Sequence, residues 1–364
     1  MKRIPFEFSL RELSGAMGDF GTLFPLSVGY IVVCGMNPAG FLVMMGLANI
    51  LTGLVYRLPL PIEPMKVIAV MAIAQRWSPS LVYATGFTMG LTWLLFSMIG
   101  VVDWIARHTP KCIVRGIQFS LAALLMLQAL QMAATGWLWA GIALGLILLL
   151  RDNRYAPAGL VIMALGVGIA LARGDLRGLA PPGLQLPPLT RFTLAEMGAG
   201  FVDAGLAQIP LTAANAVIAT AALVKLYWPE HPVPERKLAL NMGVMNTIIP
   251  FFGGFPLCHG AGGLAGQYAF GARTGGANLL EGGIEVGLGL FFAASIAQLF
   301  SVFPEAIIGA MLFYVGVQLL KGIKTLALDY ELIYVAITVI VSVLTNMALG
   351  FLVAMAAYHL TRSK

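Results

Sequence analysis

The sequence predicts an all-α polytopic membrane protein with about fourteen transmembrane segments, arranged as two inverted repeats of seven. The chain has 364 residues, of which 59% are hydrophobic and only 10% are charged, whereas a soluble domain carries about a quarter charged residues. Apolar runs follow one another along the chain, separated by glycine, proline and charge. Lysine and arginine gather in alternate connections between these runs, as the positive-inside rule expects.

The apolar runs define the expected segments. In the first half they span residues 14–34, 37–56, 62–75, 81–104, 113–133, 137–150 and 156–173. In the second half they span residues 195–224, 238–252, 258–270, 279–300, 305–320, 328–345 and 348–361. A straight crossing needs about 20 residues, and the third and tenth runs are the shortest that also follow a proline. Each of these two is therefore expected to be a broken segment, with a short extended piece before a half-helix.

The basic residues indicate the orientation. If both termini are cytoplasmic, seventeen of the 22 Lys and Arg residues lie inside, and only Arg76, Arg173, Arg177 and Arg191 lie outside. Lys66 is then left within the membrane. This bias supports an even number of segments, and we expect both termini in the cytoplasm and the protein in the plasma (inner) membrane. The net charge of +6 comes from these connections, so it does not indicate a nucleic-acid partner.

Residues 174–192 are the longest polar and proline-rich connection, and they divide the expected segments into halves of seven. An odd number per half means that the second half inserts upside down. Residues 18–27 resemble residues 203–212, and residues 60–64, before the third half-helix, resemble residues 255–258, before the tenth. Inverted repeats with interrupted helices in matching positions point to a secondary transporter with a site at the membrane midplane.

The most informative stretch is residues 253–276, where a histidine, a cysteine and a run of glycines interrupt the apolar sequence. Lipid cannot hydrogen-bond a broken backbone, so the break must face protein or a water-filled cavity. A helix that restarts at about Gly260 would aim its N–H groups, those of Ala261 and Gly262 included, into that cavity. Such groups favour an anion.

The third segment opens on prolines at positions 59, 61 and 64. They force an extended approach, and Pro64 suits the first turn of a helix. This segment runs outward and the tenth runs inward, so the two helix N-termini would point at each other across one cavity, with Met65 and Lys66 at the first of them. Two sets of amide donors and two positive dipole ends are the arrangement that an oxyanion needs.

Ionisable residues within these segments are expected to be functional, because burying them is costly. Glu63 and Lys66 are spaced to form a mutual salt bridge. Alternatively, Lys66 adds positive charge near the anion, and Glu63 balances it when the site is empty. Asp19 either caps a break in the first segment or is a protonatable carboxylate that couples proton and anion movement.

Cys258 and His259 are two possible metal ligands, but the sequence offers no second pair to complete a site, so they are weak evidence for a metal. We expect neither a metal nor a cofactor. His259 is either a ring donor to the substrate or a packing residue. An intramembrane enzyme using the two as a nucleophile–base pair is disfavoured, because neighbours at a helix start rarely meet in suitable geometry. Gln208, Thr212 and Asn215 share one helical face, as interhelical glue or as neutral donors to the cavity.

Four motifs carry a resemblance to a known family. They are residues 12–22, the Pro-Ile-Glu-Pro-Met-Lys run at 61–66, residues 208–212 with Asn215, and the long glycine-rich run at 256–268. Together they resemble the molybdate transporter family related to the sulfate permease (SulP) superfamily, over nearly the whole chain. The resemblance implies a seven-plus-seven inverted-repeat fold and uptake of molybdate.

The resemblance also implies two domains and a homodimer formed through the second of them. The core domain takes residues 1–110 and 193–302, the scaffold domain takes residues 111–175 and 303–364, and residues 176–192 link the repeats. Two positions depart from the pattern. Glu63 stands where the family usually has glutamine, and Asn215 aligns with a position that often carries an acid in the wider sulfate permease group. Selectivity and the coupling ion, a proton or another cation, are therefore left open.

We predict a secondary active transporter, not an enzyme, that imports a tetrahedral oxyanion by alternating access. Molybdate is the expected substrate, and sulfate is the second candidate. A nucleobase or other organic-anion carrier on the same architecture is the alternative. The expected partners are the anion and the lipid bilayer. The expected substrate-binding residues are Thr22, Pro64, Met65, Lys66, Gln208, Thr212, Asn215, Cys258, His259, Gly260, Ala261 and Gly262. Asp19 and Glu63 are the candidates for proton coupling.

Overall fold

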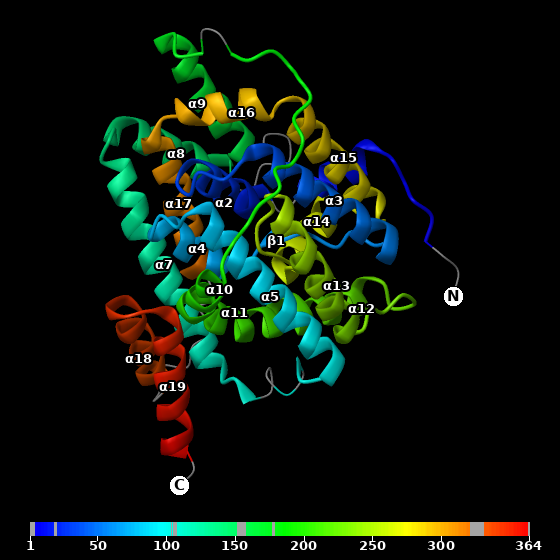
Figure 1. Ribbon diagram of the computed structural model, residues 1–364, viewed down its shortest axis with the longest axis vertical. Coiled ribbons are helices and arrows are strands. Elements are labelled where there is room, and N and C mark those ends of the chain that lie inside the picture. The colour runs from blue at the N-terminus through cyan, green and yellow to red at the C-terminus, as the bar shows by residue number, and fades with distance from the viewer. Residues whose placement is uncertain are drawn as a thin grey trace.

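Helices make up the fold, and one two-stranded ladder joins the two halves of the chain (Figure 1). The computed structural model describes residues 4–17, 20–102, 104, 108–150, 158–176, 179–320 and 331–362. Within these ranges every regular element except β1 and β2 is a helix, which confirms the all-α class.

Most helices of the first half lie close to the expected runs, although two helices, α1 and α2, overlap the one run expected over residues 14–34. They are α1 (Leu10–Ala16), α2 (Phe20–Val32), α3 (Pro38–Tyr56), α4 (Lys66–Ala74), α5 (Pro79–Ile99), α7 (Lys111–Ala133), α8 (Trp137–Leu150) and α9 (Ala158–Arg173). The strand β1 (Glu63–Pro64) lies directly before α4.

The second half begins with a continuous helical rod over Leu194–Tyr227. The rod consists of α10 (Leu194–Gly200), η2 (Phe201–Gly205), α11 (Leu206–Leu211), η3 (Thr212–Ala219) and α12 (Thr220–Tyr227), of which η2 and η3 are π-helical. The later elements are α13 (Glu235–Ile248), η4 (Ile249–Phe252), β2 (Leu257–Cys258), α14 (Ala261–Phe270), α15 (Gly276–Phe291), α16 (Ala293–Ser301), α17 (Glu305–Leu320), α18 (Glu331–Leu344) and α19 (Met347–Arg362).

Local sequence explains several of these helix starts. The Asn37 side chain caps α3 by accepting the backbone N–H groups of Ala39 and Gly40. Pro38 occupies the first position of the helix, where its missing N–H costs nothing. Ser78 caps α5 in the same way, again before a proline. Thr193 forms a reciprocal capping box with Glu196 at the start of the rod, so one polar residue and one acid satisfy two otherwise unpaired donors.

Among the residues that the structure describes, four helices are long and apolar enough to cross a membrane by length and composition: α3, α5, α7 and the rod. A fifth candidate is the pair α15 and α16, which is bent by 82°. The sequence predicted one run over residues 279–300, and the structure corrects it. Phe292 leaves the helical conformation, with φ −124° and ψ 8°, and α16 starts in a new direction.

The core is built by helix pairs that each take one member from each half of the chain: α3 packs on α15, α5 on α13, and α7 on α17. Glycines permit the close approach of the first pair. A Cβ atom built on Gly46 would lie 2.6 Å from the backbone oxygen of Gly282, which is closer than real Cβ atoms approach. Small residues at helix interfaces let backbones pack closely in membranes.

The expected linker, residues 176–192, is an extended strap bound to the second half where it is described. Gly183 and Gln185 donate backbone hydrogen bonds to Phe291 and Leu290, at 2.9 and 2.7 Å, and Thr190 donates to Phe251 at 3.0 Å. Figure 1 shows the strap as the long green trace that runs down to α10. The strap therefore contacts the region before the bend between α15 and α16 as well as η4.

The N-terminal arm is held against the loop between α14 and α15. The Glu12 carboxylate accepts the backbone N–H of Arg273 at 3.0 Å and that of Thr274 at 3.1 Å. The Thr274 hydroxyl in turn accepts the N–H of Glu7. Glu12 is buried in this contact. The N–H groups of the loop therefore replace the hydrogen bonds that its carboxylate would receive from water.

Candidate functional site

The ladder places the starts of α4 and α14 side by side. Strand β1 pairs with β2 in antiparallel register, with Glu63 opposite Cys258 and Pro64 opposite Leu257. Met65 adds a hydrogen bond from its N–H to the Pro256 carbonyl at 2.9 Å. Prolines fix an extended φ but cannot donate, so the ladder is short and α4 begins as soon as it ends.

Two buried asparagines hold the extended pieces. The Asn278 side chain accepts the Leu60 N–H at 3.0 Å and donates to the Leu60 carbonyl at 2.6 Å. Asn246 makes the same two bonds with Leu257, at 2.8 and 2.6 Å. The two side chains thereby satisfy backbone groups of the extended pieces inside an apolar core.

The first turn of α4 is capped by the rod. The Gln208 side-chain oxygen accepts the N–H of Val67 at 2.8 Å and that of Ile68 at 3.4 Å, and its amide nitrogen donates to the Thr212 hydroxyl at 2.6 Å. Gln208 therefore lies at this helix start and is held there by Thr212. The expectation that the α4 amides point at a ligand is wrong for Val67 and Ile68 in this conformation, because Gln208 already occupies them.

The first turn of α14 is uncapped. Gly260 precedes the helix in an extended conformation without a side-chain cap, close to the start that the sequence predicted. In the described part of the chain, no acceptor receives the N–H groups of Ala261, Gly262 and Gly263. Gly262 is exposed, and a Cβ built on it would meet no atom within 4 Å. These amides are the donors that the structure leaves available to an anion.

A salt bridge lies beside this turn. Glu63 Oε2 is 3.2 Å from Lys66 Nζ, and the exposed fractions of the two side chains are 3% and 22%. A Cβ built on Gly260 would lie 2.5 Å from Glu63 Oε2, and one built on Gly263 would clash with Oε1. The Glu63 carboxylate therefore packs against the face that Gly260 and Gly263 share.

His259 and Cys258 face different acceptors. His259 is fully buried, with Nδ1 3.1 Å from the Pro61 carbonyl and its ring at the edge of the Tyr56 ring. The Cys258 thiol donates to the Pro64 carbonyl at 3.8 Å. The two side chains do not bond each other, and the described residues contain no group of three potential metal ligands.

A comparison with known protein families identifies the family of this chain. The chain matches the family described as "Molybdate transporter of MFS superfamily" over residues 11–126 and 200–319, more than half of its length. The chain belongs to this family. Three of the four motifs that carried the resemblance lie at the starts of α4 and α14 and along the rod, where the site geometry is built, and the fourth, residues 12–22, overlaps α1 and α2.

Curated relatives of this family member are molybdate transporters. Molybdate transporter 1 of Arabidopsis thaliana is 28% identical, over 95% of this chain and 87% of the relative. Molybdate transporter 2 of the same plant is 29% identical, over 93% and 84%. Molybdate transporter 1 of Chlamydomonas reinhardtii is 28% identical, over 96% and 92%. All three are named as transporters, in agreement with the expectation of a non-enzyme.

Solved structures show the fold. The transmembrane domain of the cyanobacterial bicarbonate transporter BicA superposes with a TM-score of 0.68 at 17% identity, covering 97% of this chain and 100% of that one. The SLC26A9 structure gives 0.74 at 10% identity, covering 97% and 65%. The inward-facing murine Slc26a9 anion transporter gives 0.71 at 12% identity, covering 98% and 68%. The chain therefore has the fold of an integral membrane transporter.

Three expected site residues contribute no described contact to this geometry. Asn215 is partly buried in η3, and its backbone carbonyl accepts the Thr220 hydroxyl at 3.0 Å. Asp19 and the side chain of Thr22 lie outside the described residues. Sequence reasoning missed Asn246 and Asn278, although an amide within an apolar run is itself a signal, because a buried amide needs partners.

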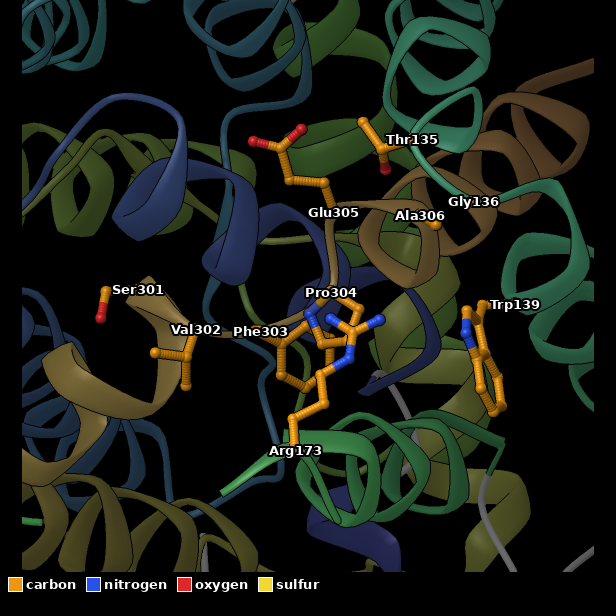
Figure 2. Close-up of a pocket in the computed structure, with 10 residues that line it drawn as sticks. All are labelled: Thr135, Gly136, Trp139, Arg173, Ser301, Val302, Phe303, Pro304, Glu305 and Ala306. Atoms are coloured by element: carbon orange, nitrogen blue, oxygen red, sulfur yellow. The ribbon is translucent and has the colours of Figure 1, made fainter. Parts of the chain in front are cut away.

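A cavity of about 270 Å³ lies elsewhere, between the loop after α7, the end of α9 and the start of α17 (Figure 2). None of the expected substrate-binding residues lines it. Its lining residues are Thr135, Gly136, Trp139, Arg173, Ser301, Val302, Phe303, Pro304, Glu305 and Ala306.

Proposed function

We propose that this chain is a secondary active transporter that imports molybdate, and that the anion binds at the first turn of α14 beside Lys66. The observation that carries the proposal is the set of open N–H groups at Ala261, Gly262 and Gly263, next to a buried ion pair whose cation is partly exposed. Backbone donors at a helix start, combined with a positive dipole end, stabilise an oxyanion.

The proposed architecture is the seven-plus-seven inverted repeat, with broken segments at β1–α4 and β2–α14. The antiparallel ladder supports it, because helices that leave antiparallel strands run in opposite directions. The domain bounds remain those proposed from the sequence, with the core at 1–110 and 193–302 and the scaffold in the remaining repeat segments. A homodimer through the scaffold, cytoplasmic termini and the plasma (inner) membrane belong to the same proposal.

We infer that His259 has a structural role at the site and does not donate a hydrogen bond to the anion. A carbonyl oxygen only accepts, so the contact with Pro61 requires the proton on Nδ1, and the neutral ring then has no proton on Nε2 to give to an anion. We infer that His259 fixes the extended piece that precedes α4. Cys258, Pro64 and Met65 contribute backbone geometry through the ladder.

Alternating access requires that the core-domain contacts at α4 and α14 change together. Gln208 links the rod to α4, so a movement of the rod would expose the amides of Val67 and Ile68 as a second set of donors. Asn215 and Thr212 lie on the same element. Coupling to a proton through Asp19 or Glu63, or to another cation, is part of the proposal.

Uptake of labelled molybdate into proteoliposomes tests the function. We expect saturable uptake that an imposed ion gradient drives, and that excess tungstate inhibits. Inhibition by sulfate at similar concentration would make the chain a broader oxyanion carrier. Inhibition by a nucleobase but not by tungstate would contradict the proposal and support the organic-anion alternative.

A further inference from the structure

We propose that Glu63 is an internal competitor for Lys66, which makes the binding free energy of an anion less favourable by an amount proportional to the charge of the anion. The inference rests on the proposed function, because it assigns a role at the proposed oxyanion site. It identifies Glu63 as the residue that sets how strongly a dianion is held relative to a monoanion of the same shape.

The position of Glu63 is fixed by the backbone. Its place in the ladder opposite Cys258 aims the side chain at the start of α14, and the lack of side chains at Gly260 and Gly263 leaves room for the carboxylate. Lys66 follows one helical turn later, and its Nζ lies 3.2 Å from Oε2. The carboxylate is thus held between a cation and a positive helix end, where a substrate oxyanion would also gain most.

The exposed fractions indicate which partner can exchange. The Glu63 side chain is 3% exposed, whereas that of Lys66 is 22% exposed, so Lys66 is the member of the pair that an anion can reach. Among the described contacts of the Glu63 carboxylate, Lys66 is the cation, and the uncharged groups are Cys258 and the two glycines. The acid and the base therefore cancel, and little net charge is left for a ligand.

Competition of this kind has a signature that depends on charge. The interaction of an anion with a fixed charge grows in proportion to the charge of the anion. Removing the Glu63 charge should therefore raise the affinity for a dianion by about the square of the factor by which it raises that for a monoanion of equal shape. A purely steric role of the side chain would change both affinities by the same factor.

Tungstate and perrhenate supply the matched pair, because both are tetrahedral oxyanions of similar size and only tungstate is a dianion. Their dissociation constants would be measured by calorimetry on the full-length purified protein and on Glu63→Gln, which keeps the shape of the side chain. Glu285→Gln is the control, since it removes another buried acid and keeps an acceptor for Asn49. We expect Glu63→Gln to bind perrhenate at least about fivefold more tightly than the wild type does. Its affinity for tungstate should rise by about the square of that factor.

Three outcomes decide the matter. Binding by the wild type with a charge-scaled gain in Glu63→Gln, and none in Glu285→Gln, supports the inference. Equal affinities, or equal gains for the two anions, overturn it and leave the proposed function intact. Absence of oxyanion binding in both the wild type and Glu63→Gln contradicts the proposed function itself. If Glu63→Gln does not fold, Glu63→Asp replaces it, because the shorter acid draws the charge away from Lys66 and should give a smaller gain of the same kind.

Discussion

The side-chain oxygen of Gln208 accepts the N–H of Val67 at 2.8 Å, so a residue in the middle of the rod caps a helix from the other half of the chain. The capping amide is itself fixed by its bond to Thr212. Both bonds are buried, so the contact couples the rod to α4 directly. A movement of the rod relative to α4 would break it and release two amides at the same time.

Removal of this cap should destabilise the protein and change transport. We expect Gln208→Ala to lower the free energy of unfolding by about 1 kcal/mol, the usual cost of a lost helix cap. Thermal unfolding in detergent measures it. Gln208→Glu keeps an acceptor for the α4 amides, so its stability should be closer to that of the wild type, while its added negative charge should weaken molybdate uptake. Equal stability of Gln208→Ala and the wild type would contradict the capping role.

Two neighbouring glycines of α14 should respond differently to the same substitution. In Gly263→Ala the new methyl group would clash with Glu63 Oε1, whereas in Gly262→Ala it would face open space. We expect Gly263→Ala to destabilise the protein by about 1–3 kcal/mol, the range for overpacking, and Gly262→Ala to leave stability near that of the wild type.

A double-mutant cycle identifies the cause of that difference. Combining Gly263→Ala with Glu63→Ala removes the group that the methyl displaces, so the combined loss should be smaller than the sum of the two single losses. Strict additivity would show that Glu63 does not occupy the face of α14 at Gly263.

Asn246 should be essential for the extended piece before α14. Asn246→Ala leaves the buried N–H and carbonyl of Leu257 without their partner, and each buried unsatisfied group costs about 1–3 kcal/mol. Asn241 lies on the same helix, and its side-chain oxygen is buried without a hydrogen-bond partner. Asn241→Ala is therefore the matched control, and its unfolding temperature should stay close to that of the wild type. A similar loss in both variants would assign the effect to α13 and not to Leu257.

Stability should depend on pH through Glu12. Burial raises the pKa of this carboxyl above its ordinary value of 4.5, and the N–H groups of Arg273 and Thr274 oppose the shift. The folded state therefore holds the proton more tightly than the unfolded chain. The stabilisation is complete below pH 4.5 and is lost as the pH rises through the raised pKa.

Glu12→Gln should remove this part of the pH dependence, which thermal unfolding measured from acidic to neutral pH would detect. Glu7→Gln removes an exposed acid from the same arm and is the control. An unchanged slope in Glu12→Gln would show that other groups cause the dependence.

The sequence predicted helix positions well where proline, glycine or a capping residue marks an end. The run expected at 137–150 is α8 with the same bounds, and the run expected at 37–56 begins one residue later, where Pro38 follows the Asn37 cap. These signals are local, because they depend on which backbone donors a neighbouring residue can satisfy.

Contacts between distant residues could not be predicted in the same way. Gln208 was expected on the cavity face, yet nothing in its neighbourhood indicates that it caps α4, more than a hundred residues earlier. No proline lies at the bend at Phe292, and the nearest glycine, Gly289, is three residues earlier. It coincides with bonds from the strap to Leu290 and Phe291, which are tertiary contacts. The salt bridge between Glu63 and Lys66 was predictable because its spacing is local.

The most direct test of the account is saturable molybdate uptake by proteoliposomes that contain the wild type, Lys66→Ala or Lys225→Ala. Lys225 is an exposed cation at the end of the rod and controls for the loss of one positive charge. We predict saturable uptake by the wild type and by Lys225→Ala, and loss of most uptake in Lys66→Ala although the protein remains folded. Undiminished uptake by Lys66→Ala, or no saturable uptake by the wild type, would contradict an oxyanion site at the start of α14.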